Sequence, residues 1–167
     1  HVYIKHARTS GNWIKLMNTT FKNSSISGTL SFFNNEGALF VAHSSLNIGK
    51  NTSITFAKNQ IHPSIYLNYS TLNVESNVHI MFNSNARSAL MMKFSTLIMK
   101  MAKITFVSNS NANEEGIAMN IETSTINIEG DLLFINNLGR TETVCIQTST
   151  LSIRNSAKLQ FINNSAI

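Results

Sequence analysis

The sequence has little charge, one cysteine and no long apolar run, and each shortage excludes a class of protein. Charged residues make up 13% of the 167 residues, against roughly 25% in ordinary soluble domains. The single cysteine, Cys145, excludes a disulfide framework within the chain. The most apolar stretch, SALMMKFSTLIMKMAKITF, is interrupted by Lys93, Lys100 and Lys103. It therefore predicts strands and no membrane span.

The charges that are present form no cluster. The formal net charge is +5, but the Lys and Arg residues are scattered, whereas nucleic-acid binding needs a clustered basic face. The histidines show no metal-ligand spacing, and neither a nucleophile elbow nor a phosphate loop appears. We therefore predict no nucleic-acid partner, no metal and no cofactor. The histidines are His1, His6, His43, His62 and His79.

Asn, Ser and Thr take the place of the missing charge, and a Phe-x-x-Asn frame recurs among them. These residue types compete with helical backbone bonds, and β-branched Thr and Ile suit pleated strands, so a mainly helical fold is excluded. Differences between the Phe numbers give spacings of 24, 26, 24, 28 and 27 residues, a period typical of solenoids. The frames are Phe32/Asn35, Phe56/Asn59, Phe82/Asn85, Phe106/Asn109, Phe134/Asn137 and Phe161/Asn164.

Two further frames recur with the same period. Two hydroxyl residues precede an apolar anchor in every unit, and the positions seven and five residues before each anchor are apolar in all six units. An aliphatic residue also stands two positions before each Phe, which is the alternation of a strand. Each unit therefore predicts three short strands. The anchors are Phe21, Leu46, Leu72, Leu97, Ile126 and Leu151.

Three strands per unit predict an all-β fold, a right-handed parallel β-helix of about six rungs. A β-sandwich is the less favoured alternative, because it does not require one three-part pattern at one period. We expect residues 1–167 to form a single segment whose two ends lie inside repeats of a longer chain, with flanking repeats as its neighbours. The Phe of each unit is expected in the core. The Asn residues, Asn35, Asn59, Asn85, Asn109, Asn137 and Asn164, are expected to form a ladder, because a carboxamide both donates and accepts hydrogen bonds.

The Phe-x-x-Asn frame, together with a Gly-containing element, resembles the repeats of the chlamydial polymorphic outer membrane proteins. The Gly-containing element is present as EGAL, around Gly37, and as EGIA, around Gly116. The resemblance covers essentially the whole chain. It implies a right-handed β-helix of pectin-lyase-like shape and a surface-exposed, adhesin-like role.

Enzymes with this fold place acids or bases on the outward face of the first strand. Here the outward positions are Lys15, Phe40, Tyr66, Met91, Asn120 and Cys145, without a carboxylate. The neighbouring outward column contains Glu122, for which Lys93 is the expected ion-pair partner. The Glu129-Gly130-Asp131 segment is interpreted as a solvated turn, and Cys145 as a small unreactive side chain. Together these assignments predict a protein without catalytic activity in this segment.

The remaining candidate is a binding surface. Phe40, Tyr66 and Met91 predict an outward apolar stripe, a feature that often marks contact with a partner. Asn120 follows in the same column, and Glu114 and Glu115 lie at the tip of the longest connection, where repeat proteins often carry recognition. A cell-surface protein or a glycan is the expected partner. A covering segment would equally explain the stripe, and a solvated insertion would explain the connection.

The Asn-x-Ser/Thr pattern for N-glycosylation favours an extracellular or cell-surface location. It would equally suit a eukaryotic secreted protein with similar repeats. The expected function is a structural and adhesive scaffold. The alternatives are a carbohydrate-binding or carbohydrate-processing module whose active residues lie outside the segment, and a stalk without a ligand. The acceptor residues are Asn18, Asn23, Asn51, Asn68 and Asn163.

Overall fold

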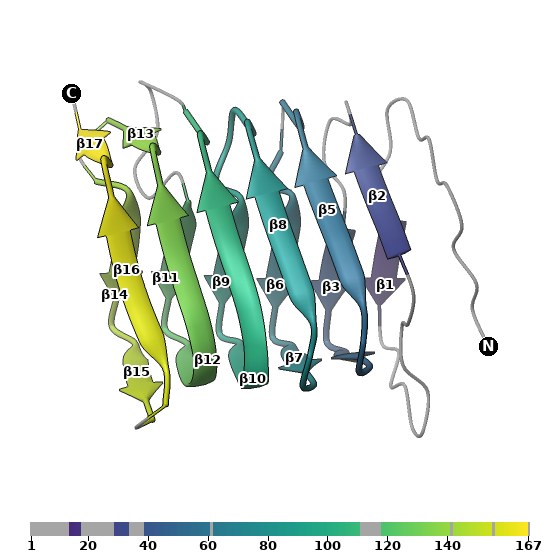
Figure 1. Cartoon of the computed structure of the whole chain (residues 1–167). Helices are drawn as coiled ribbons and strands as arrows, with labels where there is room; N and C mark the ends of the chain where they lie inside the picture. Colours follow the sequence, from purple (N-terminus) through teal and green to yellow (C-terminus); the bar gives the residue numbers. More distant parts are fainter. Residues whose placement is uncertain are drawn as a thin grey trace.

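The computed structural model of the chain is a right-handed parallel β-helix, as the repeats predict. It describes residues 14–17, 29–33, 39–60, 62–110, 118–140, 142–154 and 156–166. Figure 1 shows the rungs stacked in sequence order, from purple to yellow. Within these ranges every strand pairing is parallel. The described residues include no helix that could cross a membrane.

The first strands of successive rungs form a six-stranded sheet. Its register joins equivalent repeat positions, so that Phe40 lies beside Tyr66, and Tyr66 beside Met91. The strands, in spatial order, are β1 (Ile14–Met17), β3 (Leu39–Ala42), β6 (Ile65–Asn68), β9 (Leu90–Lys93), β11 (Met119–Glu122) and β14 (Val144–Gln147).

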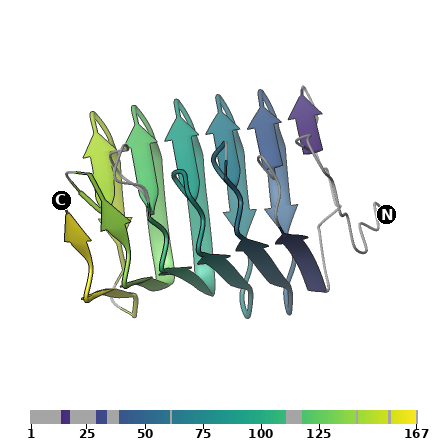
Figure 2. The ribbon, with the colours of Figure 1, turned by 90° about the horizontal axis from the view of Figure 1, so that it is seen from above.

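The second and third strands of the rungs form a nine-stranded sheet, and Figure 2 shows it facing the first one. In the fourth and fifth units these two strands merge into one long bent strand, β10 (Thr96–Val107) and β12 (Thr125–Ile135). The second strands elsewhere are β4 (Ser45–Ile48), β7 (Thr71–Val74) and β15 (Thr150–Ile153). The third strands elsewhere are β2 (Thr29–Phe33), β5 (Ser53–Ala57), β8 (His79–Asn83) and β16 (Lys158–Ile162). A small sheet joins β13 (Leu138–Gly139) to β17 (Ser165–Ala166).

The core lies between the sheets and consists of the alternating apolar positions of the repeat. Its most regular part is a column of Phe rings, which confirms the predicted inward position of Phe. Consecutive ring centroids are 4.7 to 5.1 Å apart and the rings are nearly parallel. This is the spacing of neighbouring strands, so each ring is held over the next by the backbone pairing. The rings belong to Phe32, Phe56, Phe82, Phe106, Phe134 and Phe161.

The predicted Asn ladder is confirmed for its five described members, from Asn59 to Asn164. In Asn109, Oδ1 accepts bonds from the backbone N (3.0 Å) and the Nδ2 (2.8 Å) of Asn85. Its Nδ2 donates to Asn137 Oδ1 at 2.9 Å and to the carbonyl of Phe82 at 3.2 Å. The pattern repeats along the column, so that each carboxamide oxygen accepts the backbone and side-chain hydrogen bonds of the Asn in the preceding rung. Asn35 lies outside the described residues.

A second ladder, of serines, follows the first strands. From Ser44 to Ser124, the backbone N of each serine donates to the hydroxyl of the serine in the next rung, over 2.9 to 3.2 Å. Each hydroxyl also donates to a carbonyl two residues earlier, over 2.7 to 2.8 Å. The first residue of the hydroxyl pair in each of these repeats therefore belongs to a hydrogen-bonded column along the corner, in addition to its place in the turn. The serines are Ser44, Ser70, Ser95, Ser124 and Ser149.

The predicted solvated turn is wrong. Glu129, Gly130 and Asp131 form no separate turn, because β12 continues through them. Thr105 points away from the core as its register requires, but it is buried, since Met81 and Leu133 lie beside it on the neighbouring strands.

The last rung exposes side chains that are buried elsewhere in the same columns. Leu159 is 40% exposed and Phe161 is 54% exposed, whereas Ile104 and Phe106 are at most 1% exposed. The difference arises because no described rung lies over β16. The predicted contact with flanking repeats stays a prediction.

Candidate functional site: an aromatic face on the first sheet

The outward side of the first sheet carries the predicted apolar stripe. Phe40 and Tyr66 contact each other with ring centroids 5.3 Å apart and an interplanar angle of 55°, and Met91 follows in register. All three are half-buried, as is Asn120 on the next strand. Cys145 continues this outward column but is buried. The stripe is therefore present, with part of each side chain exposed.

A second aromatic column stands beside the stripe, at the corner where each first strand ends. The rings of His43 and Tyr69 stack with centroids 5.2 Å apart, and those of Tyr69 and Phe94 with centroids 4.7 Å apart. The interplanar angles are 5° and 9°. Tyr69 is 53% exposed and Phe94 is 44% exposed. We call His43, Tyr69 and Phe94 the corner stack, and the corner stack together with Phe40, Tyr66 and Met91 the aromatic face.

The backbone explains why these rings point outward. The φ angles of His43, Tyr69 and Phe94 are 49°, 48° and 49°, in the left-handed region that bulky residues rarely adopt. This conformation ends the strand and leads into the serine ladder. Stacking of the rings offsets part of the conformational cost, because offset or parallel aromatic pairs contribute roughly 0.5 to 1.5 kcal/mol.

Sequence reasoning missed the corner stack, although a signal for it exists. Each ring directly precedes the hydroxyl pair of its unit, as in His43-Ser44, Tyr69-Ser70 and Phe94-Ser95. The position was not among the three alternating frames, so no register was assigned to it. Adding it as a fourth frame would have predicted a column of residues three positions before each anchor.

The predicted ion pair between Lys93 and Glu122 is confirmed and lies at the end of the corner stack. Lys93 Nζ and Glu122 Oε2 are 2.7 Å apart. The hydrogen bond to Glu122 raises the pKa of Lys93 above its usual value of 10.5, and the negative charge of Glu122 adds to it. Both groups are substantially exposed, so the pair is a surface feature rather than a source of much stability.

After Phe94, polar side chains replace the aromatic ones on this face. Thr123 takes the place of a ring at the corner, with the same backbone conformation, φ 48°, and Thr148 follows with φ 51°. The adjacent outward positions are Glu122 and Gln147. An aromatic half of the face therefore borders a half that offers hydroxyl, amide and carboxylate groups.

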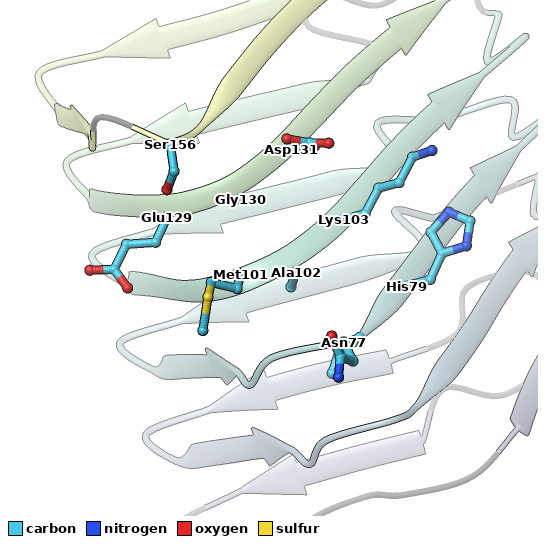
Figure 3. A pocket seen from close by; sticks show the side chains of 10 residues that line it. Asn77, His79, Met101, Ala102, Lys103, Glu129, Gly130, Asp131 and Ser156 are labelled. Carbon is cyan, nitrogen blue, oxygen red and sulfur yellow. The ribbon is translucent and has the colours of Figure 1, made fainter.

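A separate open pocket of about 500 Å³ lies at the corner between the second and third strands (Figure 3). It forms where the register slips: two residues of β10, Met101 and Ala102, stand opposite the single Gly130 of β12. A Cβ at Gly130 would overlap the backbone oxygen of Ala102. Position 130 therefore requires glycine, because the backbone of Ala102 approaches it closely. The corner of β12 is one residue shorter than the corner of β10, and this difference leaves the pocket.

The pocket contains charges of both signs. Figure 3 shows His79, Lys103 and Asp131 on three neighbouring strands. Burial lowers the pKa of His79 below its usual value of 6.5, and nearby Lys103 lowers it further. Glu129 forms an ion pair with Arg154. Among the described residues no group of three or more His, Cys, Asp or Glu side chains could hold a metal ion.

The remaining predicted site residues are distributed over the surface. Asn51 and Asn163 are exposed, each with φ above 50°, whereas Asn68 is half-buried on the first-sheet face, in register with Lys93. The other four, Asn18, Asn23, Glu114 and Glu115, lie outside the described residues.

Comparisons with protein-family models, with curated proteins and with solved structures found no match. The class of molecule that the geometry defines is a β-solenoid with stacked Asn side chains.

Proposed function

We propose that the chain is a non-catalytic β-helical scaffold of an extracellular or cell-surface protein, and that it binds its partner through the aromatic face. The observation that carries this proposal is the exposure of Tyr69 and Phe94, at 53% and 44%, beside the half-buried stripe of Phe40, Tyr66 and Met91. Contiguous exposed apolar surface on a soluble domain typically marks an interaction site.

Rigidity supports the same role. The face rests on a sheet whose strands are held by the serine ladder where they end and by the Asn ladder near where they begin, since Asn59 Nδ2 donates to Ser64 Oγ directly before β6. Side chains fixed by such pairing lose little further conformational freedom on binding, which favours affinity. The stack also repeats along the helix axis, so an extended partner would meet similar groups on consecutive rungs.

Two features support an extracellular setting. Asn51 and Asn163 carry the N-glycosylation pattern at exposed turns, where a glycan would not disturb the core. The resemblance of the Phe-x-x-Asn frames to chlamydial polymorphic outer membrane proteins points to a surface-exposed adhesin-like molecule as well. A pectin-lyase-like shape belongs to the same resemblance.

The proposal is tested by binding of the fluorescently labelled 167-residue chain to intact cells, compared with a variant in which Tyr69 and Phe94 are both alanine. We expect saturable binding by the parent and a loss of at least tenfold in affinity in the variant. Met101→Ala is the matched control, because Met101 is 68% exposed but lies at the other corner.

Equal binding by all three proteins would refute the aromatic face as the binding surface, and absence of binding by the folded parent would refute adhesion. Thermal unfolding of each variant, followed by circular dichroism, establishes that it is folded. Release of sugar fragments from a polysaccharide by the parent chain would instead favour the carbohydrate-processing alternative.

A further inference from the structure

The corner stack stops one rung before the polar half of the face begins. His43, Tyr69 and Phe94 occupy the same backbone position in three consecutive rungs, and Thr123 occupies it in the fourth. Tyr69 is stacked on both faces, by His43 and by Phe94. Among the described residues no ring contacts the second face of Phe94, and 44% of the residue is exposed.

One face of the Phe94 ring is therefore without a stacked ring among the described residues, and we call the region over this face the space. The backbone at Thr123 has a φ of 48°, against 49° at Phe94, so a ring at this position would continue the stack with the same spacing of about 4.8 Å. The threonine side chain is too short to cover the face of Phe94. A ring that entered the space from solvent would thus stack on Phe94 and pass along Thr123.

The groups around this space are polar. Lys93 and Glu122 directly precede Phe94 and Thr123 in their rungs, and their charged ends are joined at 2.7 Å. Thr123 is exposed in the next rung and adds a hydroxyl to this border. Donors and acceptors therefore border one aromatic surface, with charges that neutralise each other.

We propose that the space bounded by Phe94, Thr123 and the Lys93–Glu122 pair binds a neutral pyranose ring of a glycan. The proposal rests on the proposed function, since it assigns a ligand class to one end of the aromatic face. One side of a pyranose presents C–H groups, which are attracted to the negative face of an aromatic ring. Its rim carries hydroxyls that both donate and accept, as the ion pair and Thr123 require.

Other occupants fit the groups less well. An aromatic side chain of a protein partner would stack on Phe94, but it would leave the ion pair without new hydrogen bonds while displacing its water, which is unfavourable. A sugar acid or a sulfated sugar would bring a charge next to a pair that is already neutral. Small-molecule sites usually combine an apolar surface with a few polar groups that fix orientation, and this is the arrangement found here.

The test uses an array of neutral gluco-, manno- and galacto-oligosaccharides, with sialylated and uronic-acid oligosaccharides as charged comparators. The 167-residue chain is produced without N-glycosylation, so that no glycan of its own at Asn68 occupies the face. Two variants are compared with the parent: Phe94→Ala removes the stacking surface, and Thr123→Phe fills the space with a fourth ring. Titration of the best neutral oligosaccharide then gives affinities.

We expect the parent to bind at least one neutral class, and both variants to bind it at least tenfold more weakly. Thr123→Phe should also raise the unfolding temperature, because it extends the stack. A raised unfolding temperature would show that loss of binding in this variant does not result from misfolding. Phe94→Tyr, which keeps the ring, is expected to bind within about threefold of the parent, since aromatic faces are similar in Phe and Tyr.

Three results would overturn the inference. Binding of neutral glycans that is unchanged in Thr123→Phe would place the sugar elsewhere, and a preference for the charged comparators would refute the ligand class. Cell binding that depends on Tyr69 and Phe94 and is abolished by protease, but survives enzymatic removal of the cell-surface glycans, would identify a protein partner, which retains the proposed function and refutes the glycan. Absence of both cell and glycan binding would refute the two proposals together.

Discussion

The Asn ladder allows a sharp prediction of stability from a single substitution, Asn109→Ala. Asn109 is fully buried in the middle of the column. Its side chain makes four hydrogen bonds, two as acceptor from Asn85 and two as donor, to Asn137 and to the carbonyl of Phe82. Alanine would remove all four without changing the strand pattern of the repeat.

The magnitude follows from the groups left behind. Two donors of Asn85, its backbone N–H and one amide hydrogen, lose their acceptor inside the core. Asn137 Oδ1 still accepts from the backbone N of residue 109, at 3.0 Å in the parent. Each buried donor without a partner costs about 1 to 3 kcal/mol, so the free energy of unfolding should fall by about 2 to 6 kcal/mol. Domains of this size are stable by only about 5 to 15 kcal/mol.

Asn164→Ala is the matched control. The Asn164 side chain makes three corresponding bonds, two as acceptor from Asn137 and one as donor to the carbonyl of Phe134, but it is only half-buried in the last described rung. Because water can reach Asn137 once the Asn164 side chain is gone, the loss should be about 1 kcal/mol, the net value of an ordinary hydrogen bond.

Urea unfolding of the 167-residue chain, followed by far-ultraviolet circular dichroism, measures both free energies. A cooperative transition is required for the comparison. The reasoning would be refuted by equal losses at the two positions, or by a loss below about 1 kcal/mol at Asn109, because either would mean that the buried ladder contributes no more than an exposed bond.

Three further predictions concern the core and the pocket. Phe106→Ala should cost about 3 to 5 kcal/mol, as truncations of buried Phe do, whereas Phe161→Ala, at a residue 54% exposed, should cost less than half as much in the same urea assay. Gly130→Ala should lower stability by at least about 1 to 3 kcal/mol, because its Cβ would meet the backbone of Ala102; an unchanged unfolding midpoint would contradict the observed register slip. Since the folded-state pKa of His79 lies below its usual value of 6.5, the unfolded state binds more protons near that pH, so the stability that neutral His79 provides is complete above pH 6.5 and is lost as pH falls through the folded pKa. His79→Gln should therefore lessen the decline of the urea midpoint below pH 6.5, and an identical decline in parent and variant would refute this role.

The repeat in the sequence was sufficient to predict the fold. In a parallel β-helix, equivalent positions of successive units lie side by side, so a frame such as Phe-x-x-Asn specifies strand register as well as strand position. The Phe column and the Asn ladder followed from this rule. The ion pair between Lys93 and Glu122 followed too, because it joins equivalent positions one rung apart.

Side-chain burial and the shape of the corners required the tertiary structure. Thr105 is buried because Met81 and Leu133 flank it, and Gly130 lies in a strand because β10 carries an extra residue opposite it. Both facts depend on residues of the neighbouring strands and not on the sequence of the segment itself. The pocket at this corner depends on the difference between two rungs, which a single-unit pattern does not contain.

The β-helix, the inward columns and the Asn ladder can be read from the repeat alone, because a period repeated six times fixes which residues lie beside one another. The exposure of the outward residues and the formation of the corner stack depend on how the rungs pack. The rings of His43, Tyr69 and Phe94 meet because a left-handed backbone conformation turns each of them outward at the same place. The proposed binding surface depends on the backbone conformation at the corners and on the burial of side chains by neighbouring rungs. Both are properties of the folded chain.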